Sequence, residues 1–166
     1  MPREASRGED IMNQSAEKHL ESNRGAAVLL VDEDLEYLET VRRLIQGSGH
    51  SVDACNSYTE GIRQLQSGTF DIIVVGQGSR NFEGRCVLEC ATAFDRQLPV
   101  VVVARNVEME CYLEAMQLGA VDYISPGLSG VEIARVVQTH ALQRKSRSGK
   151  VEPERSTAAA MSAGAA

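Results

Sequence analysis

The sequence contains no apolar run near the roughly 20 residues that a membrane-spanning helix requires. Residues 1–24 are polar and of mixed charge, and they lack the hydrophobic segment of a secretory signal. Four cysteines are present, but they show neither zinc-site spacing nor a Cys-x-x-Cys pair. These absences predict a cytoplasmic protein whose cysteines are reduced thiols.

The sequence also shows no cluster of histidines and no excess of basic residues in residues 25–143. The three histidines, His19, His50 and His140, lie in separate segments and so indicate no catalytic or metal site. Residues 25–143 hold 8 Lys and Arg against 16 Asp and Glu. This acidic balance argues against a nucleic-acid-binding surface on the body of the protein.

The chain does contain continuous apolar runs. Residues 26–31, 72–75 and 100–104 consist entirely of Ala, Val, Leu and Ile. Such runs are typical of strands buried on both faces, as in a parallel sheet covered by helices. Ligands and chemistry in these sheets sit at the carboxyl ends of the central strands. The working group is therefore expected at position 76, where a glycine stands.

Helical patterns alternate with the strand patterns. We expect further strands at 50–55 and 121–125, and helices at 35–46, 58–67, 85–96, 107–118 and 128–142. Asp34 is the expected N-cap of the first helix, and Ser57 with Glu60 is a capping box for the second. Five strand–helix units in a row predict an α/β fold, a doubly wound parallel sheet with helices on both faces. The pattern alone does not fix the strand order.

Composition divides the chain into three parts. Residues 26–143 form the predicted domain. Residues 1–25 are expected to be a flexible arm, because their few apolar positions support at most a marginal helix. Residues 144–166 hold 5 basic against 2 acidic residues and are otherwise rich in Ser, Gly and Ala. We expect them to form a disordered, solvated tail.

Taken together, the motifs resemble the receiver domains of two-component response regulators. The resemblance covers residues 26–143 and rests on Val28 to Asp34, Asp71 to Gly76, Glu83-Gly84, Pro99 to Ala104 and Gly119 to Ile124. It implies a flavodoxin-like (βα)5 fold with strand order 2-1-3-4-5. It also implies a chemistry in which two acids hold Mg²⁺ and an aspartate accepts a phosphoryl group.

Three of the five positions that this chemistry needs are altered. The phosphoacceptor position falls on Gly76, which has no nucleophile. The hydroxyl position falls on Ala104. The lysine position falls on Pro126, or on Ser125 if one residue is deleted, and neither is a cation. The charge of an acyl phosphate would therefore be poorly neutralised.

We accordingly predict a pseudo-receiver that keeps the signalling fold, has lost the phosphorylation switch and has no enzymatic activity. Two alternatives stay open. A receiver could be modified at a non-standard residue, with Ser79, Ser125 or Glu83 as candidates. A flavodoxin-like protein could instead bind a nucleotide or flavin cofactor over the strand ends, although the acidic loop at residues 32–34 would repel phosphate.

The acid pair of the family falls on Asp32 and Glu33. Two neighbouring carboxylates repel each other, and a cation would relieve that repulsion. The third ligand implied by the resemblance is the missing aspartate, so we expect no functional metal, with a weak Mg²⁺ site of millimolar affinity as the alternative. Arg105 lies beside this cleft and could replace the metal with an internal ion pair.

The helix expected at 107–118 carries two apolar sides. Its predicted core side is Val107, Cys111, Ala115 and Leu118, and its predicted partner side is Met109, Tyr112, Leu113 and Met116. In the family the surface of 107–118, 121–125 and 128–142 forms dimers and contacts partners, and Tyr123 falls on the aromatic switch position. The expected partner is a histidine kinase, another regulator or a second copy, with no nucleic acid and no membrane.

Overall fold

The computed structural model describes residues 25–124 and 130–148. Its strands are β1 (Ala27–Val31), β2 (Ser51–Cys55), β3 (Ile72–Gly76), β4 (Val100–Val103) and β5 (Asp122–Ile124). Its helices are α2 (Leu35–Gly47), α3 (Tyr58–Ser67), α4 (Arg85–Phe94), α5 (Met109–Gln117) and α6 (Gly130–Ser148). The strands form one parallel sheet in the order β2-β1-β3-β4-β5, which confirms the expected fold and strand order.

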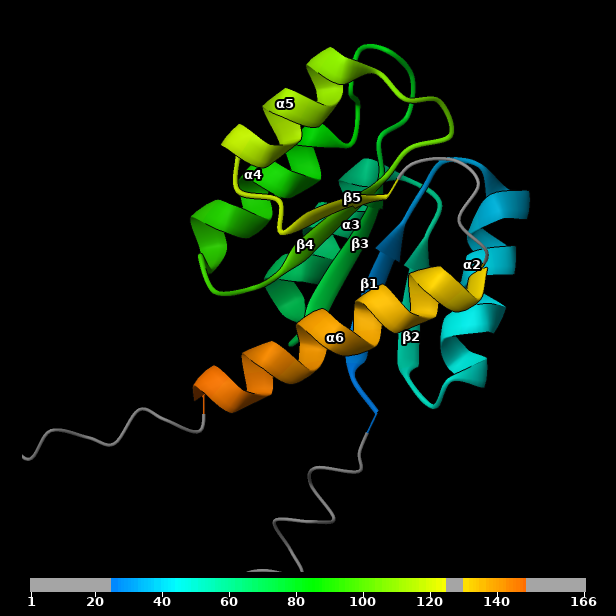
Figure 1. The fold of residues 1–166 in the computed structure, drawn as a ribbon, viewed down its shortest axis with the longest axis vertical. Helices are drawn as coiled ribbons and strands as arrows, with labels where there is room; N and C mark the ends of the chain where they lie inside the picture. The colour runs from blue at the N-terminus through cyan, green and yellow to red at the C-terminus, as the bar shows by residue number, and fades with distance from the viewer. Residues whose placement is uncertain (1–24, 125–129, 149–166) are drawn as a thin grey trace, which may run out of the picture.

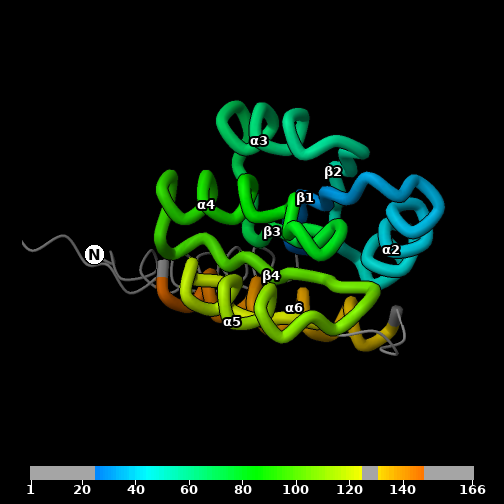
Figure 2. The backbone as a smooth tube through the Cα atoms, turned by 90° about the horizontal axis from the view of Figure 1, so that it is seen from above, coloured from blue at the N-terminus to red at the C-terminus, as the bar shows by residue number. Residues whose placement is uncertain are grey.

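Helices cover both faces of the sheet (Figures 1 and 2). Alternate residues of each strand point to opposite faces, because the side-chain period of a strand is two. Leu29 and Val31 of β1 therefore join a core with α3, α4 and α5. Val28 and Leu30 join a second core with α2 and α6. All four Val residues of β4 are buried, as a strand sandwiched between two helical layers requires.

The predicted helix starts are only partly correct. Asp34 is the N-cap of α2, and its side chain accepts a hydrogen bond from the Tyr37 backbone N–H at 3.0 Å, which confirms that prediction. Ser57 is the N-cap of α3, but its side chain makes no capping hydrogen bond. The expected capping box does not form, because the Glu60 carboxylate instead accepts from Arg63 and Gln64 within its own helix.

Several predicted helix faces and ends are wrong. Val107 is exposed because α5 begins two residues later, at Met109. On α6, Ala134, Val137 and Ala141 are buried together with Ile133, whereas Val131, near the start of the helix, is exposed. Helix α6 also continues to Ser148, beyond the predicted domain end at 143, and Arg144 forms an ion pair with Asp95 at 3.0 Å. The predicted arm at 1–24 and the tail from 149 lie outside the described residues.

None of the described helices is long and apolar enough to cross a membrane.

A close backbone approach joins the end of β3 to the start of α4. A Cβ atom on Gly84 would lie 3.1 Å from the carbonyl carbon of Gly76 and closer still to its oxygen. The Gly84 backbone N–H donates to the carbonyl oxygen of Gln77 at 3.1 Å. Only a residue without a side chain fits between these two elements. Gly84 therefore sets the position of the loop at residues 77–84.

Replacing Gly84 with alanine should destabilise the protein, because the added methyl group must push α4 away from β3. We expect a loss of about 1–3 kcal/mol in the free energy of unfolding, measured by chemical denaturation. Gly47→Ala is the control, since a Cβ there meets nothing within 4 Å, and helix propensity favours alanine. Equal stability of the two variants would contradict this interpretation.

Candidate functional site

The predicted site residues converge at the carboxyl edge of the sheet. Asp32 directly follows β1, Gly76 is the last residue of β3, and Ala104 directly follows β4. The register pairs Val31 with Val75 and Gly76 with Val103, so these strand ends are neighbours. Loops that follow β1 and β4 lie at the top of the view in Figure 1. The structure therefore brings Asp32, Gly76 and Ala104 together, as the sequence predicts.

The space over Gly76 is occupied by the side chain of Asp32. A Cβ atom built on Gly76 would lie 2.7 Å from Cγ of Asp32 and closer still to Oδ2. Any side chain at position 76 would displace that carboxyl group. The present position of the Asp32 carboxyl group therefore depends on glycine at 76, and a larger residue would require this side chain to move.

Arg105 holds the Asp32 carboxylate in this position. Its guanidinium forms ion pairs with Oδ1 of Asp32 and, at 3.0 Å, with Oδ2 of Asp34. It also lies over the ring of Tyr37, 5.3 Å from the ring centroid. The internal ion pair considered from the sequence is present. Its second acid is Asp34, however, whereas Glu33 of the predicted pair is exposed.

Burial dominates the electrostatics of Asp32. The residue is 4% exposed, and desolvation raises the pKa of its carboxyl group. The Asp34 backbone N–H, which donates to Oδ1 of Asp32 at 2.8 Å, and the charge of Arg105 oppose that rise. The charged form of Asp32 therefore depends on these two partners for its compensation.

A magnesium ion does not fit this arrangement of donors. Oδ1 of Asp32 already accepts from Arg105 and from the Asp34 backbone, and the family's third ligand would have come from position 76. In residues 25–124 and 130–148, no group of three or more His, Cys, Asp or Glu could hold a metal. The guanidinium of Arg105 supplies the positive charge that a cation would otherwise bring to these carboxylates.

The predicted hydroxyl position is occupied by Ala104, which has no hydroxyl group. Ala104 is buried, and its backbone N–H donates to the carbonyl oxygen of Ile124 at 3.0 Å. Ser125 and Pro126, the two alternatives for the lysine position, lie outside the described residues. Among the substitute acceptors, the Ser79 hydroxyl donates to the Glu83 carboxylate at 2.5 Å, so these two residues bind each other in the loop.

Sequence reasoning missed two buried polar side chains beside the site. Gln77 is 2% exposed, and its side-chain oxygen accepts from the Tyr123 hydroxyl. The Tyr58 hydroxyl donates to the carbonyl oxygen of Gly76 at 3.2 Å, and burial raises the pKa of Tyr58 well above its usual range. A glutamine between two glycines suggests a solvent-exposed loop, so only the fold reveals its burial.

The predicted partner side of α5 is exposed. Met109 and Leu113 are 64% and 51% exposed, and Tyr112 and Met116 are each 39% exposed. Cys111 and Ala115, on the opposite side, are buried in the core. We call the first set, Met109, Tyr112, Leu113 and Met116, the α5 face.

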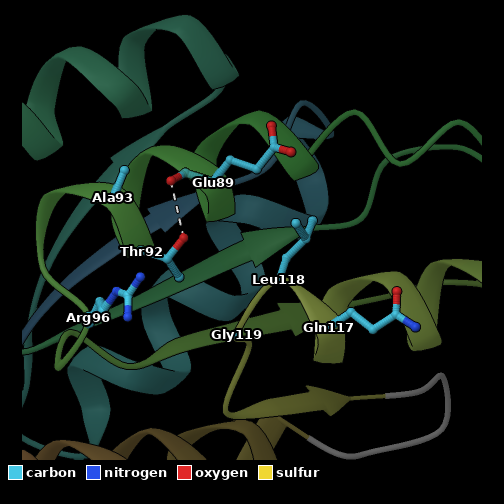
Figure 3. Close-up of a pocket in the computed structure, with 7 residues that line it drawn as sticks. All are labelled: Glu89, Thr92, Ala93, Arg96, Gln117, Leu118 and Gly119. Carbon is cyan, nitrogen blue, oxygen red and sulfur yellow. Dashed lines mark hydrogen bonds between the residues drawn. The ribbon is translucent and has the colours of Figure 1, made fainter.

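A separate hollow of about 560 Å³ lies between the carboxyl-terminal ends of α4 and α5 (Figure 3). It is lined by Glu89, Thr92, Ala93, Arg96, Gln117, Leu118 and Gly119. These residues precede β4 and β5, so the hollow lies at the edge where strands begin, away from Gly76. None of the predicted site residues lines it.

Comparison with known proteins agrees with the resemblance seen in the sequence. The protein-family model for the response regulator receiver domain matches residues 28–138. The chain is 26% identical over 97 residues to the transcriptional regulatory protein ZraR of Escherichia coli, covering 58% of this chain and 22% of that protein. It is 29% identical over 103 residues to the alginate biosynthesis transcriptional regulatory protein AlgB of Pseudomonas aeruginosa, covering 62% of this chain and 23% of that protein. The chain thus matches about a fifth of the length of these curated relatives.

Solved structures show the same fold. A CheY-like receiver domain from Methanospirillum hungatei superposes with a TM-score of 0.69 at 17% identity, covering 74% of this chain and 98% of that one. A receiver domain from Clostridium thermocellum superposes with a TM-score of 0.68 at 18% identity, covering 74% and 98% of the two chains.

Removing the guanidinium of Arg105 should make the carboxylates of Asp32 and Asp34 accessible to cations. We expect Arg105→Ala to lower the free energy of unfolding by about 1–2 kcal/mol, because Asp32 loses its charged partner in a nearly buried position. Millimolar Mg²⁺ should then raise the melting temperature of this variant and leave that of the wild type unchanged.

Arg85→Ala is the matched control, because Arg85 pairs with the partly exposed Glu89 and Glu114. It should change stability by less than about 0.5 kcal/mol and confer no Mg²⁺ response. An equal Mg²⁺ response of wild type and Arg105→Ala would contradict the assignment of Arg105 as the internal cation.

Proposed function

This chain belongs to the response regulator receiver domain family, and we propose that it is a pseudo-receiver that acts without phosphorylation. Receiver domains interact with histidine kinases or other regulators. We infer that this protein keeps that role as a protein-binding module, without enzymatic activity and without a bound cofactor. Its specificity would come from the α5 face and from the altered loop at residues 77–84.

The observation that carries this proposal is the placement of Asp32. Its carboxylate fills the space that a side chain at position 76 would need, and Arg105 holds it there. A phosphoryl group delivered to this edge would meet no nucleophile at 76, no hydroxyl at 104 and an ion pair in place of a metal. Restoring an aspartate alone would not restore the reaction, since the new side chain would compete with Asp32 for the same space.

Charge suggests the chemistry of the partner. The α5 face lies beside three glutamates, Glu108, Glu110 and Glu114, and α5 itself contains no Lys or Arg. Arg80 pairs with Glu108 and Arg85 with Glu114, which leaves one net negative charge, that of Glu110, among these five residues. A second copy docked symmetrically would bring like charges together, whereas an apolar surface with basic residues at its rim would be complementary. We therefore propose a different protein of that kind as the partner.

Incubation of the full chain with acetyl phosphate and Mg²⁺ tests the loss of phosphorylation. Intact-mass measurement should find no phosphoryl adduct on the wild type. Gly76→Asp should also remain unmodified, because its carboxylate has no room beside Asp32. A stoichiometric adduct that hydroxylamine removes from the wild type would overturn the proposal, since hydroxylamine cleaves an acyl phosphate.

Partner binding can be tested by affinity capture from the lysate of the source cells, followed by quantitative mass spectrometry. Met109→Gln/Leu113→Gln/Met116→Gln should lose proteins that the wild type captures, because apolar contact area on the α5 face is removed. Phe94→Gln, which alters an exposed apolar residue of α4 outside this surface, is the control and should behave like the wild type. An identical captured set for all three proteins would rule out the α5 face, and sedimentation of the wild type would reveal a second copy as the partner.

A further inference from the structure

Apart from the tyrosine hydroxyls, Gln77 and Asp32 are the two buried polar side chains in residues 25–124 and 130–148. Burial of an amide side chain is unfavourable unless both its ends form hydrogen bonds. Gln77 satisfies both. Its Nε2 donates to the carbonyl oxygen of Ser79 at 3.1 Å, and its Oε1 accepts from the hydroxyl of Tyr123.

The backbone of Gln77 is fixed as firmly as its side chain. Its N–H donates to the carbonyl oxygen of Val103 at 2.8 Å, and its carbonyl oxygen accepts from the Gly84 N–H at 3.1 Å. Gln77 therefore links the end of β3 to β4, to its own loop and, through Tyr123, to β5. Because its backbone and side-chain groups are all hydrogen-bonded, Gln77 cannot change its position without breaking at least one of these bonds.

Tyr123 connects Gln77 to the α5 face. Its ring makes an edge-to-face contact with the ring of Tyr112, with centroids 5.4 Å apart and planes at 84°. Tyr112 is 39% exposed and belongs to the α5 face. A continuous chain of contacts thus runs from Gln77 at the strand ends, through Tyr123, to the surface proposed to bind a partner.

We propose that Gln77 is a positioning residue that holds the α5 face in one conformation. It keeps the Tyr123 ring turned toward the strand ends, and Tyr123 in turn fixes the position of Tyr112. This inference rests on the proposed function, because it matters only if the α5 face binds a partner. The coupling is reciprocal, so a partner that displaces Tyr112 would also loosen the loop at residues 77–84.

The restraint is directional because the Tyr123 hydroxyl is the donor that satisfies Oε1 of Gln77. If Tyr123 turned outward, that buried oxygen would lose its hydrogen bond. Phenylalanine at 123 could not make the bond, and leucine at 77 could not accept it. Each change should therefore release this contact, and Tyr123→Phe also removes the hydrogen bond between the Glu108 backbone and the Tyr123 oxygen.

The test uses the full chain labelled with ¹³C at tyrosine, because its 4 tyrosines give an aromatic NMR spectrum that can be assigned completely. Gln77→Leu should shift the ring signals of both Tyr123 and Tyr112. Amide hydrogens of α5 should exchange about tenfold faster than in the wild type. Tyr123→Phe removes a single oxygen atom, preserves the fold and should shift Tyr112 in the same way, and the double variant should add no further shift.

Tyr58→Phe is the matched control. It removes another buried tyrosine hydroxyl, which bonds the neighbouring Gly76 carbonyl, and should leave the Tyr112 signal unchanged. Unmoved Tyr112 signals in Gln77→Leu and Tyr123→Phe, or additive effects of the two changes, would overturn the proposal. If Gln77→Leu also captured the same proteins as the wild type, the proposed function would stand and only the positioning role would fall.

Discussion

A nearly buried carboxylate and its guanidinium partner organise the carboxyl edge of this sheet. Asp32 is held between Arg105 and the backbone N–H of Asp34. Such a carboxylate is tolerated only when its charge is compensated. Where the family resemblance implies a divalent cation bound between acids, this structure places the guanidinium of Arg105. The charge of Asp32 is thus compensated by a side chain of the protein itself.

The consequences extend from this edge toward the surface. Gly76 must be small because Asp32 lies above it. Gln77, the next residue, is drawn into the interior and bonds Tyr123. Tyr123 meets Tyr112 on α5, whose exposed side is apolar. Contacts thus run from the ion pair at the strand ends to the exposed apolar side of α5, and this continuity is the physical basis on which we propose binding without a chemical signal.

Much of the fold could be predicted from the sequence, because continuous Val and Ile runs have few structural alternatives. The strand order required the family resemblance, since periodicity does not encode it. Val107 is exposed, although its spacing predicts the core side, because a helix periodicity fixes spacing but not the first residue of the helix. The sequence places Arg105 near Asp32 and Glu33. That Arg105 pairs with Asp34 and not with Glu33 depends on the position of Asp34 as the N-cap of α2. Nothing in the sequence around Gln77 predicts that its side chain is buried and hydrogen-bonded to Tyr123.

We propose that the strand-end site is closed to phosphoryl groups. The most direct measurement is a ¹H–¹⁵N NMR titration of the full chain with beryllofluoride, a phosphoryl mimic, in the presence of Mg²⁺. If the site is closed, the amide signals of Asp32, Gly76 and Ala104 stay where they are. Saturable shifts of these signals, together with that of Tyr123, would contradict it.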